Sequence, residues 1–188
     1  MKPINLAIRI ALGLLVLDQA SKLWVRTQMF PGESIQVLGP YFQLFFIENN
    51  GMAFGLEWGG RTGKFLLTSF RLLAVAGLGV YFWNLIQKGM TRTGGTVALA
   101  LIWAGACGNI VDSLFYGRLF GYEDWMYGRV VDMLYFPLFQ GFLPDWLPFW
   151  GGDYFVFFRP VFNLADSGIS VGVGMSLFFY QRIFVENP

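Results

Sequence analysis

Four stretches of the chain stay apolar over roughly the 20 residues that an α-helix needs to cross a bilayer. They lie at about 6–25, 66–86, 95–115 and 163–183. The pattern predicts an all-α integral membrane protein, a single domain over 1–188 with four transmembrane helices. The first stretch could instead be a signal peptide, because Lys2 precedes its apolar core, but no clean small-x-small cleavage site follows it.

Two long connections, about 27–64 and 117–161, separate these helices, and a short one joins the second to the third. Between Ile35 and Ile47, β-branched, aliphatic and aromatic residues flank Gly39-Pro40, which predicts two short strands around a turn. The 136–160 stretch is rich in Pro and aromatic residues. We interpret it as an inserted flap at the membrane interface or, equally, as a loop without a catalytic role.

The orientation follows from Lys and Arg in short loops, which are retained in the cytoplasm. The short connection carries Lys88 and Arg92, and the chain ends carry Lys2, Arg9 and Arg182. With four spans, all of these lie on one side. We therefore expect cytoplasmic termini and two extracytoplasmic long connections, the first of which holds a small β-structure.

Composition narrows the chemistry further. Only 13% of the residues are charged, there is no His, and Cys107 is the single Cys. These absences exclude Ser-His-Asp and Cys-His catalysis, and His- or Cys-based metal sites. A net charge of +1 gives no basic field for nucleic acid. Any acid–base chemistry must come mainly from carboxylates, Lys or Tyr.

Ionisable residues at membrane depth are functional hypotheses by default. Four acids fall near the predicted outer boundary: Asp18, Asp112, Asp132 and Asp166. Two of them in one cleft could act as general acid and general base. Spacing alone does not choose the pair. Asp18 and Lys22, at i and i+4, also fit a self-neutralising interfacial pair, and Arg71 fits a snorkelling side chain.

Five motifs run in order through most of the chain, and together they resemble the lipoprotein signal peptidase family (signal peptidase II). They are the segments DQASK from Asp18 to Lys22, NNGMAFG from Asn49 to Gly55, GACGNIVD from Gly105 to Asp112, VVD ending at Asp132, and FNLAD from Phe162 to Asp166.

The resemblance implies an aspartic endopeptidase with Asp132 and Asp166 as its catalytic dyad. It implies that Asn49 and Gly51 contact the substrate backbone on a small extracytoplasmic β-cradle. It also implies five residues that shape the cleft or bind the substrate: Asp18, Lys22, Asn109, Asp112 and Asn163. The implied substrate is a diacylglyceryl-modified prolipoprotein, cut N-terminal to its lipidated Cys, and a globomycin-type antibiotic is expected to block the cleft. The implied location is the bacterial cytoplasmic membrane, in contact with lipid. We expect no cofactor, no metal and a monomer.

One position departs from the family pattern. Ser113 follows the acid Asp112 where the family usually has Arg, so the role of that cation is open, and Arg118 or Arg129 could replace it. Two other functions remain for the intramembrane acids. A small transporter or channel subunit would distribute charges through the bilayer depth. A non-catalytic scaffold would have no need for acids at 132 and 166.

Overall fold

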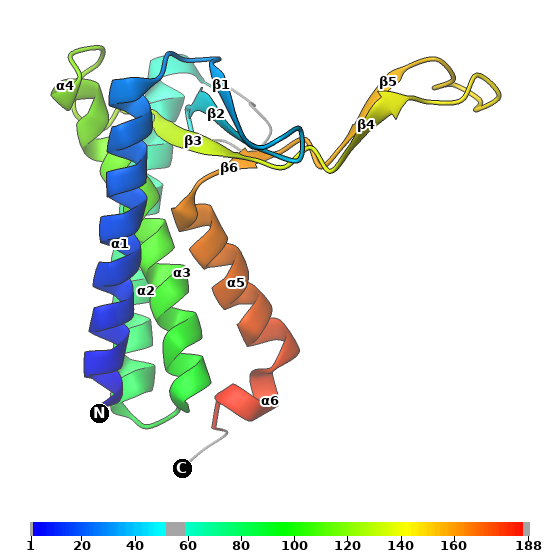
Figure 1. Ribbon diagram of the computed structural model, residues 1–188. Coiled ribbons are helices and arrows are strands. Elements are labelled where there is room, and N and C mark those ends of the chain that lie inside the picture. Colours follow the sequence, from blue (N-terminus) through cyan, green and yellow to red (C-terminus); the bar gives the residue numbers. More distant parts are fainter. Residues whose placement is uncertain (1, 52–58, 186–188) are drawn as a thin grey trace.

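Three long helices form the body of the molecule in a computed structural model, which describes residues 2–51 and 59–185 (Figure 1). They are α1 (Pro3–Gln28), α2 (Gly60–Gln87) and α3 (Thr93–Val111). The last continues without a break through the π-helical turn η2 (Asp112–Tyr116) and α4 (Gly117–Leu119). By length and composition, these three helices can cross a membrane. Three of the predicted spans are therefore helical, each with longer ends than predicted.

The fourth predicted span differs from its expected bounds. Helix α5 (Leu164–Phe178) is only 15 residues long, and α6 (Tyr180–Ile183) follows a break at Phe179. The break lets the chain turn toward the connection between α2 and α3, where the backbone N–H of Arg92 donates to the carbonyl of Ile183 at 2.9 Å. Both chain ends consequently lie at the same end of the bundle (Figure 1).

An antiparallel sheet covers the other end of the bundle. Its four strands, in spatial order, are β1 (Ser34–Leu38), β2 (Phe42–Asn49), β3 (Val130–Tyr135) and β6 (Val161–Phe162). The first two confirm the strand pair predicted around Gly39-Pro40. Strands β3 and β6, which no sequence pattern predicted, join the sheet from the second long connection.

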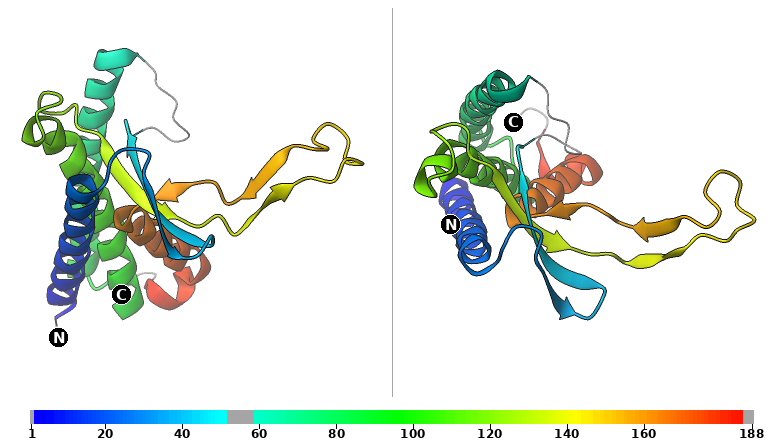
Figure 2. Two further views of the ribbon diagram at one scale, coloured as in Figure 1. Left: turned by 45° about the horizontal axis from the view of Figure 1, so that its top comes forward. Right: turned by 90° about the horizontal axis from the view of Figure 1, so that it is seen from above.

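A compact apolar cluster holds the sheet against the helices. It is formed by the buried residues Val25, Met29, Phe46, Tyr116, Val131 and Met133. These side chains come from the end of α1, from η2, and from the inner face of β2 and β3. The two further views show β3 crossing directly over the ends of the helices (Figure 2). This contact fixes β3 relative to the helices, so that residues on both can share one site.

The 136–160 stretch forms a second, two-stranded element instead of an irregular loop. Strands β4 (Phe139–Phe142) and β5 (Tyr154–Phe157) pair in an antiparallel hairpin. The hairpin leaves the sheet between β3 and β6 and projects sideways from the bundle in all ribbon views (Figures 1 and 2).

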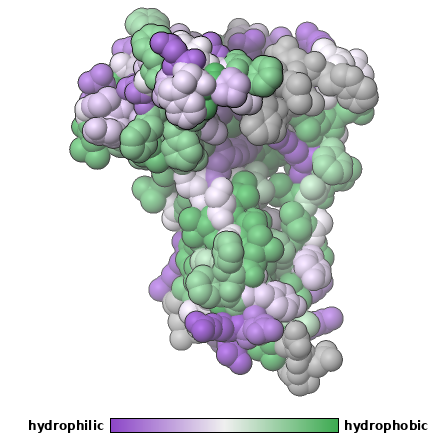
Figure 3. Space-filling model, turned by 90° about the vertical axis from the view of Figure 1, so that its right-hand side faces the viewer, coloured by the Kyte–Doolittle hydropathy of each residue, from purple (hydrophilic) through white to green (hydrophobic). Residues whose placement is uncertain are grey.

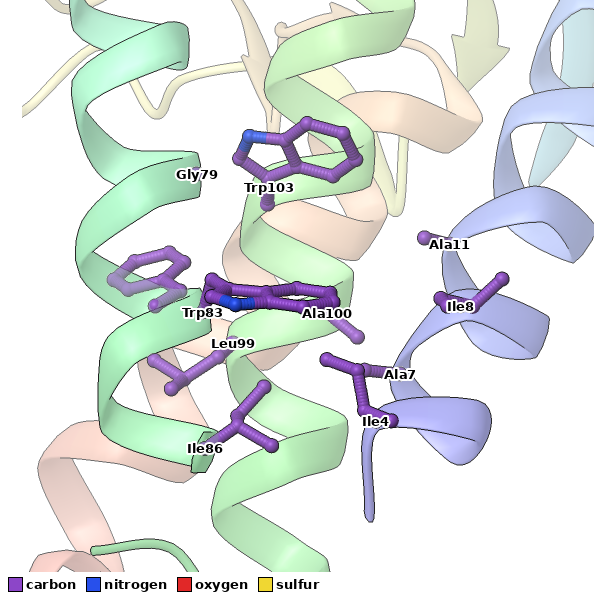
Figure 4. A pocket seen from close by; sticks show the side chains of 11 residues that line it. Ile4, Ala7, Ile8, Ala11, Gly79, Trp83, Ile86, Leu99, Ala100 and Trp103 are labelled. Atoms are coloured by element: carbon purple, nitrogen blue, oxygen red, sulfur yellow. The ribbon is translucent and has the colours of Figure 1, made fainter. Parts of the chain in front are cut away.

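The helical part carries a broad hydrophobic surface, and hydrophilic residues gather in the hollow between it and the sheet (Figure 3). An apolar cavity of about 220 Å³ opens between α1, α2 and α3 near the N-terminus, away from the sheet (Figure 4). Apolar residues such as Ile4, Trp83, Leu99 and Trp103 line it. It therefore offers no acid–base groups, unlike the polar hollow under the sheet.

Candidate active site

A polar cavity of about 250 Å³ lies where the sheet meets the helices. Its lining comes from β2, β3, α2, α3 and α5 and consists of Asn49, Gly51, Arg71, Asn109, Val130, Asp132 and Asp166. Two of these are the acids that the resemblance implies as a dyad. The fold thus brings Asp132 from a strand and Asp166 from the first turn of a helix into one cavity.

Asn163 connects the two acids. Its side-chain Nδ2 donates to Oδ1 of Asp132 at 2.7 Å, and its Oδ1 accepts from the backbone N–H of Asp166 at 2.8 Å. The carboxylate of Asp166 in turn accepts from the backbone N–H of Asn163 at 3.4 Å, which completes a capping box for α5. A backbone N–H can only donate, so the orientation of this amide is fixed, and its NH₂ group must face Asp132.

Asn109 serves Asp166 in the same way. Its Nδ2 donates to Oδ1 of Asp166 at 2.7 Å, while its Oδ1 accepts from the ammonium of Lys22 at 2.9 Å. A lysine ammonium has no acceptor, so Lys22 forces the NH₂ of Asn109 toward the acid. Each acid of the cavity therefore receives at least one N–H from an amide whose orientation a second donor determines.

Lys22 itself lies in a fully buried ionic cluster. Its side chain is 0% exposed, and Nζ lies 2.9 Å from Asp18 and 2.8 Å from Asp112, both also 0% exposed. With Asn109 as the third acceptor, all three N–H bonds of the ammonium are used. The i,i+4 pair of Asp18 and Lys22 therefore forms as the sequence suggested, and a second acid, Asp112 from η2, completes the cluster.

The cluster also holds the backbone beside each acid of the cavity. Asp112 accepts from the backbone N–H of Val131 at 3.3 Å, and Asp18 accepts from that of Ala165 at 2.9 Å. These residues directly precede Asp132 and Asp166. Gly108 makes the close approach possible, since a Cβ there would lie 2.6 Å from Oδ2 of Asp18. The predicted cleft-shaping residues Asp18, Lys22 and Asp112 are thus a scaffold behind the cavity wall.

The surroundings raise the pKa of Asp132. The residue is 5% exposed, and burial together with the nearby charge of Asp166 raises its pKa to about 7. Hydrogen bonds from Asn49 and Asn163 and the charge of Lys22 oppose this rise without cancelling it. A carboxyl group that titrates near neutral pH can both hold and release a proton during a reaction.

The Asn49–Gly51 segment forms the rim of the cavity. Asn49 donates to Oδ2 of Asp132 at 3.4 Å and accepts from the backbone N–H of Gly51 at 2.7 Å. Gly51 has a φ of +89°, which favours glycine, and a Cβ there would collide with Arg71. The following motif residues Met52 to Gly55 lie outside the described residues.

Arg71 lines the cavity, although its sequence position fitted a snorkelling side chain. Its guanidinium donates to the carbonyl of Gly51, and Lys64, seven residues earlier on α2, donates to that of Asn50 at 2.8 Å. Arg71 therefore points into the site instead of snorkelling to an interface. The sequence did contain a signal for a functional role of Arg71, because it is the single charged residue within 66–86.

The two arginines suggested as replacements at the Ser113 departure do not line the cavity. Arg129 binds Glu48 at 3.1 Å, and Arg118 is exposed. Ser113 itself is buried and donates to the backbone carbonyl of Asn109 at 3.2 Å. Among the residues lining the described cavity, Arg71 supplies the cationic side chain.

The comparisons with known proteins agree on one family. The family model described as signal peptidase (SPase) II matches residues 10–182. The lipoprotein signal peptidase of Porphyromonas gingivalis is 48% identical over 185 residues, covering 90% of this chain and 80% of the relative. That of Amoebophilus asiaticus is 41% identical over 187 residues, covering 95% and 78%.

Solved structures with a similar fold point the same way. A structure described as a bacterial membrane enzyme at 2.3 Å resolution superposes with a TM-score of 0.66 and 28% identity, covering 95% of this chain and 89% of the other. A second, at 1.9 Å resolution, gives a TM-score of 0.63 and 28% identity, covering 95% and 94%.

Proposed function

The chain belongs to the signal peptidase II family, and we propose that Asp132 and Asp166 are the aspartic dyad with which it cleaves. As a member of this family, it is a protease of the bacterial inner membrane that removes signal peptides from prolipoproteins. One observation carries the dyad assignment. Both acids line a single cavity, and each receives an N–H from an amide of fixed orientation.

In the proposed mechanism, the dyad shares one proton and hydrolyses the peptide by direct attack of water. The ionised acid takes a proton from the water as its oxygen bonds to the scissile carbonyl carbon. The protonated acid gives its proton to the carbonyl oxygen. When the C–N bond breaks, the proton taken from water passes to the leaving amine, and the other returns from the intermediate to the dyad.

Asp132 is the acid that holds the proton in the resting site, and Asp166 is the base. Burial and the charge of Asp166 raise the pKa of Asp132 to about 7. Asp166 lies at the third position of α5, where the helix dipole favours a negative charge, and it accepts a 2.7 Å hydrogen bond from Asn109.

Arg71 positions the rim of the site and contributes positive charge beside the dyad. It binds the Gly51 carbonyl from α2, and it lines the same cavity as both acids. With Ser113 buried where the family usually has Arg, Arg71 is the cation available to a substrate in this cavity. We expect Asn49, Gly51 and Arg71 together to bind the backbone of the substrate near the scissile bond.

The substrate we propose is the diacylglyceryl-modified prolipoprotein, cut N-terminal to the lipidated Cys. The signal helix would enter from lipid along the hydrophobic surface of the helical part, which borders the polar hollow under the sheet (Figure 3). Globomycin-type antibiotics would block the same cavity. A monomer contains every residue that this mechanism uses.

The proposed topology has four spans, with α5 and α6 together crossing as the fourth. Lys2, Lys88, Arg92 and Arg182 lie in the segments at the end opposite to the sheet, where both termini lie (Figure 1). The positive-inside rule makes that end cytoplasmic and places the dyad near the extracytoplasmic face. The comparisons favour the peptidase over a transporter or a scaffold.

The substrate proposal is tested with purified protein in vesicles and one prolipoprotein prepared with and without the diacylglyceryl group. We expect a cut immediately before the modified Cys, located by mass spectrometry, and no cut in the unmodified precursor. Equal cleavage of both precursors would show that the enzyme does not recognise the diacylglyceryl group. A globomycin-type inhibitor should stop the reaction.

A further inference from the structure

The hairpin between β3 and β6 exposes an unusual concentration of aromatic side chains. We define the arm as residues 138–160. Nine of its 23 residues are aromatic, whereas aromatic residues make up 19% of the whole chain, and only Asp145, Asp153 and Arg159 are charged. At its tip, Phe149 is 95% exposed and Trp146 is 78% exposed. Side chains of this kind do not stay in water without a counterpart.

The base of the arm is fixed, so the exposed part has a defined direction. Phe136 stacks on Phe42 with ring centroids 4.6 Å apart and on Phe162 at 5.8 Å. Phe158 packs edge-on against Phe162 at 6.1 Å. These contacts join the arm to β2 and β6, and beyond them the hairpin runs sideways, clear of the bundle (Figure 2).

The strand register separates the hairpin into two different faces. Directly opposite residues share a face, and residues alternate along each strand. Phe139 pairs with Phe157, and Gly141 with Phe155, which places three Phe side chains on one face without a polar group. The opposite face combines Phe142 and Val156 with Gln140 and Tyr154, whose side chains hydrogen-bond to each other at 3.2 Å.

We propose that the arm lies in the headgroup region of the bilayer, with the Phe139–Phe155–Phe157 face toward the acyl chains. The arm leaves the molecule at the end of the apolar helices, at the level where a bilayer that they cross has its surface (Figures 1 and 3). Aromatic residues, Trp and Tyr above all, are the side chains that this layer favours.

The depth of the arm is limited by its backbone. A two-stranded hairpin satisfies only the inner N–H and C=O groups of its strands, and the outer ones need water or headgroups. Asp145 and Asp153 near the tip also need water or headgroups, because a carboxylate is costly to place among acyl chains. The arm is therefore an interfacial anchor, not a fifth span.

The anchor is connected directly to the dyad. Leu134 pairs with Phe162, and Tyr135 with Val161, so the strand that carries Asp132 and the strand that leads to Asn163 and Asp166 both continue into the arm. An arm held at the membrane surface would fix the height of the cavity above the acyl chains. This consequence rests on the proposed function, whereas the membrane contact itself does not.

The test measures depth and needs no cleavage. In a Cys107→Ala background, Phe155→Cys, Gln140→Cys and Asp124→Cys each receive a nitroxide spin label, and the protein is reconstituted into phosphatidylethanolamine–phosphatidylglycerol vesicles. Collisions with oxygen and with a water-soluble nickel chelate then report depth. Asp124 lies in a loop at the same end of the bundle and is 67% exposed, so it is the aqueous reference.

We expect the label at 155 to be shielded from nickel and open to oxygen, and the label at 140 to lie nearer the water. A label at 155 as open to nickel as that at 124 would overturn the proposal. Spectral broadening at 155 that disappears on dilution with unlabelled protein would also overturn it, because a second copy would then cover the face.

A matched pair of variants tests the choice of face. Adding Phe139→Ser and Phe157→Ser to the label at 155 removes two of the three Phe rings, and the nickel accessibility of that label should rise toward the value at 124. Phe142→Ser, on the opposite face, should leave it unchanged. The reverse pattern would contradict the assigned orientation.

Discussion

The ammonium nitrogen of Lys22 lies 2.9 Å from Oδ1 of Asn109. Since the ammonium can only donate, this contact turns the NH₂ group of Asn109 toward Asp166, 2.7 Å away. A residue of α1 thereby determines which group of Asn109 hydrogen-bonds to an acid of α5. The same ammonium neutralises part of the charge of Asp18 and Asp112, so its removal tests structure and catalysis together.

The Lys22→Met variant should be less stable than the unmodified protein. The change leaves Asp18 and Asp112 buried without their cation, and breaking a buried ion pair in this way costs roughly 3–5 kcal/mol. Thermal unfolding in detergent measures the loss. Lys88→Met, in the exposed connection after α2, is the control and should change little. Equal effects of the two substitutions would contradict the buried cluster.

Gly108→Ala should destabilise the protein, while Gly174→Ala should not. A Cβ at Gly108 would lie 2.6 Å from Oδ2 of Asp18, whereas nothing lies within 4 Å of a Cβ at Gly174. Overpacking typically costs about 1–3 kcal/mol, and an unobstructed helical glycine gains roughly 0.5–1 kcal/mol on replacement by alanine. The difference in unfolding midpoint between these two variants measures the tightness of the contact between α1 and α3.

Stability should fall as the pH rises through about 7. The pKa of Asp132 is raised from its usual 3.8 to about 7 by burial and by the charge of Asp166, so the native state holds a proton that the unfolded chain releases at lower pH. The stabilisation from this proton is complete below pH 4 and is lost through the folded pKa. Unfolding midpoints between pH 5 and pH 8 should show it, and Asp132→Asn should flatten the decline. An unchanged slope in the variant would assign the decline to another group.

Arg71→Gln should lower cleavage and shift its pH dependence. Loss of a positive charge beside the dyad favours the protonated form, so the alkaline limb of the kcat/KM profile should move to higher pH. Arg71→Lys, which keeps the charge, should restore the position of that limb even if the contact with Gly51 is weakened. A purely structural role for Arg71 would lower the rate without moving the profile.

The helices and the first strand pair could be predicted from the sequence because their patterns are local. Apolar runs of span length predicted three of the helices, and the β-branched, aliphatic and aromatic residues on either side of Gly39-Pro40 predicted β1 and β2. The ordered motifs gave the five segments that meet around Lys22 and the cavity. Neither pattern predicted that α5 ends at Phe178, or that Ile183 then contacts Arg92, because this contact joins distant parts of the chain.

The remaining features depend on partners far away in the chain. Strand β3 exists because β2 and β6 pair with it on either side, and no local alternation marks it. The i,i+4 pair of Lys22 with Asp18 could be predicted, whereas its other two partners, Asn109 of α3 and Asp112 of η2, lie far away in the sequence. Arg71 looked like a snorkelling residue because its partner, the Gly51 carbonyl, precedes it by 20 positions.

The most direct test of the dyad is single-turnover cleavage of a diacylglyceryl-modified prolipoprotein by Asp132→Asn and Asp166→Asn. Each change keeps the shape of the acid and removes its proton transfer, so we expect no measurable cleavage from either variant, with unfolding midpoints that show both are folded. Asp145→Asn, in the exposed arm, should cleave at the unmodified rate. Full activity in either dyad variant would contradict the central claim that Asp132 and Asp166 together activate water.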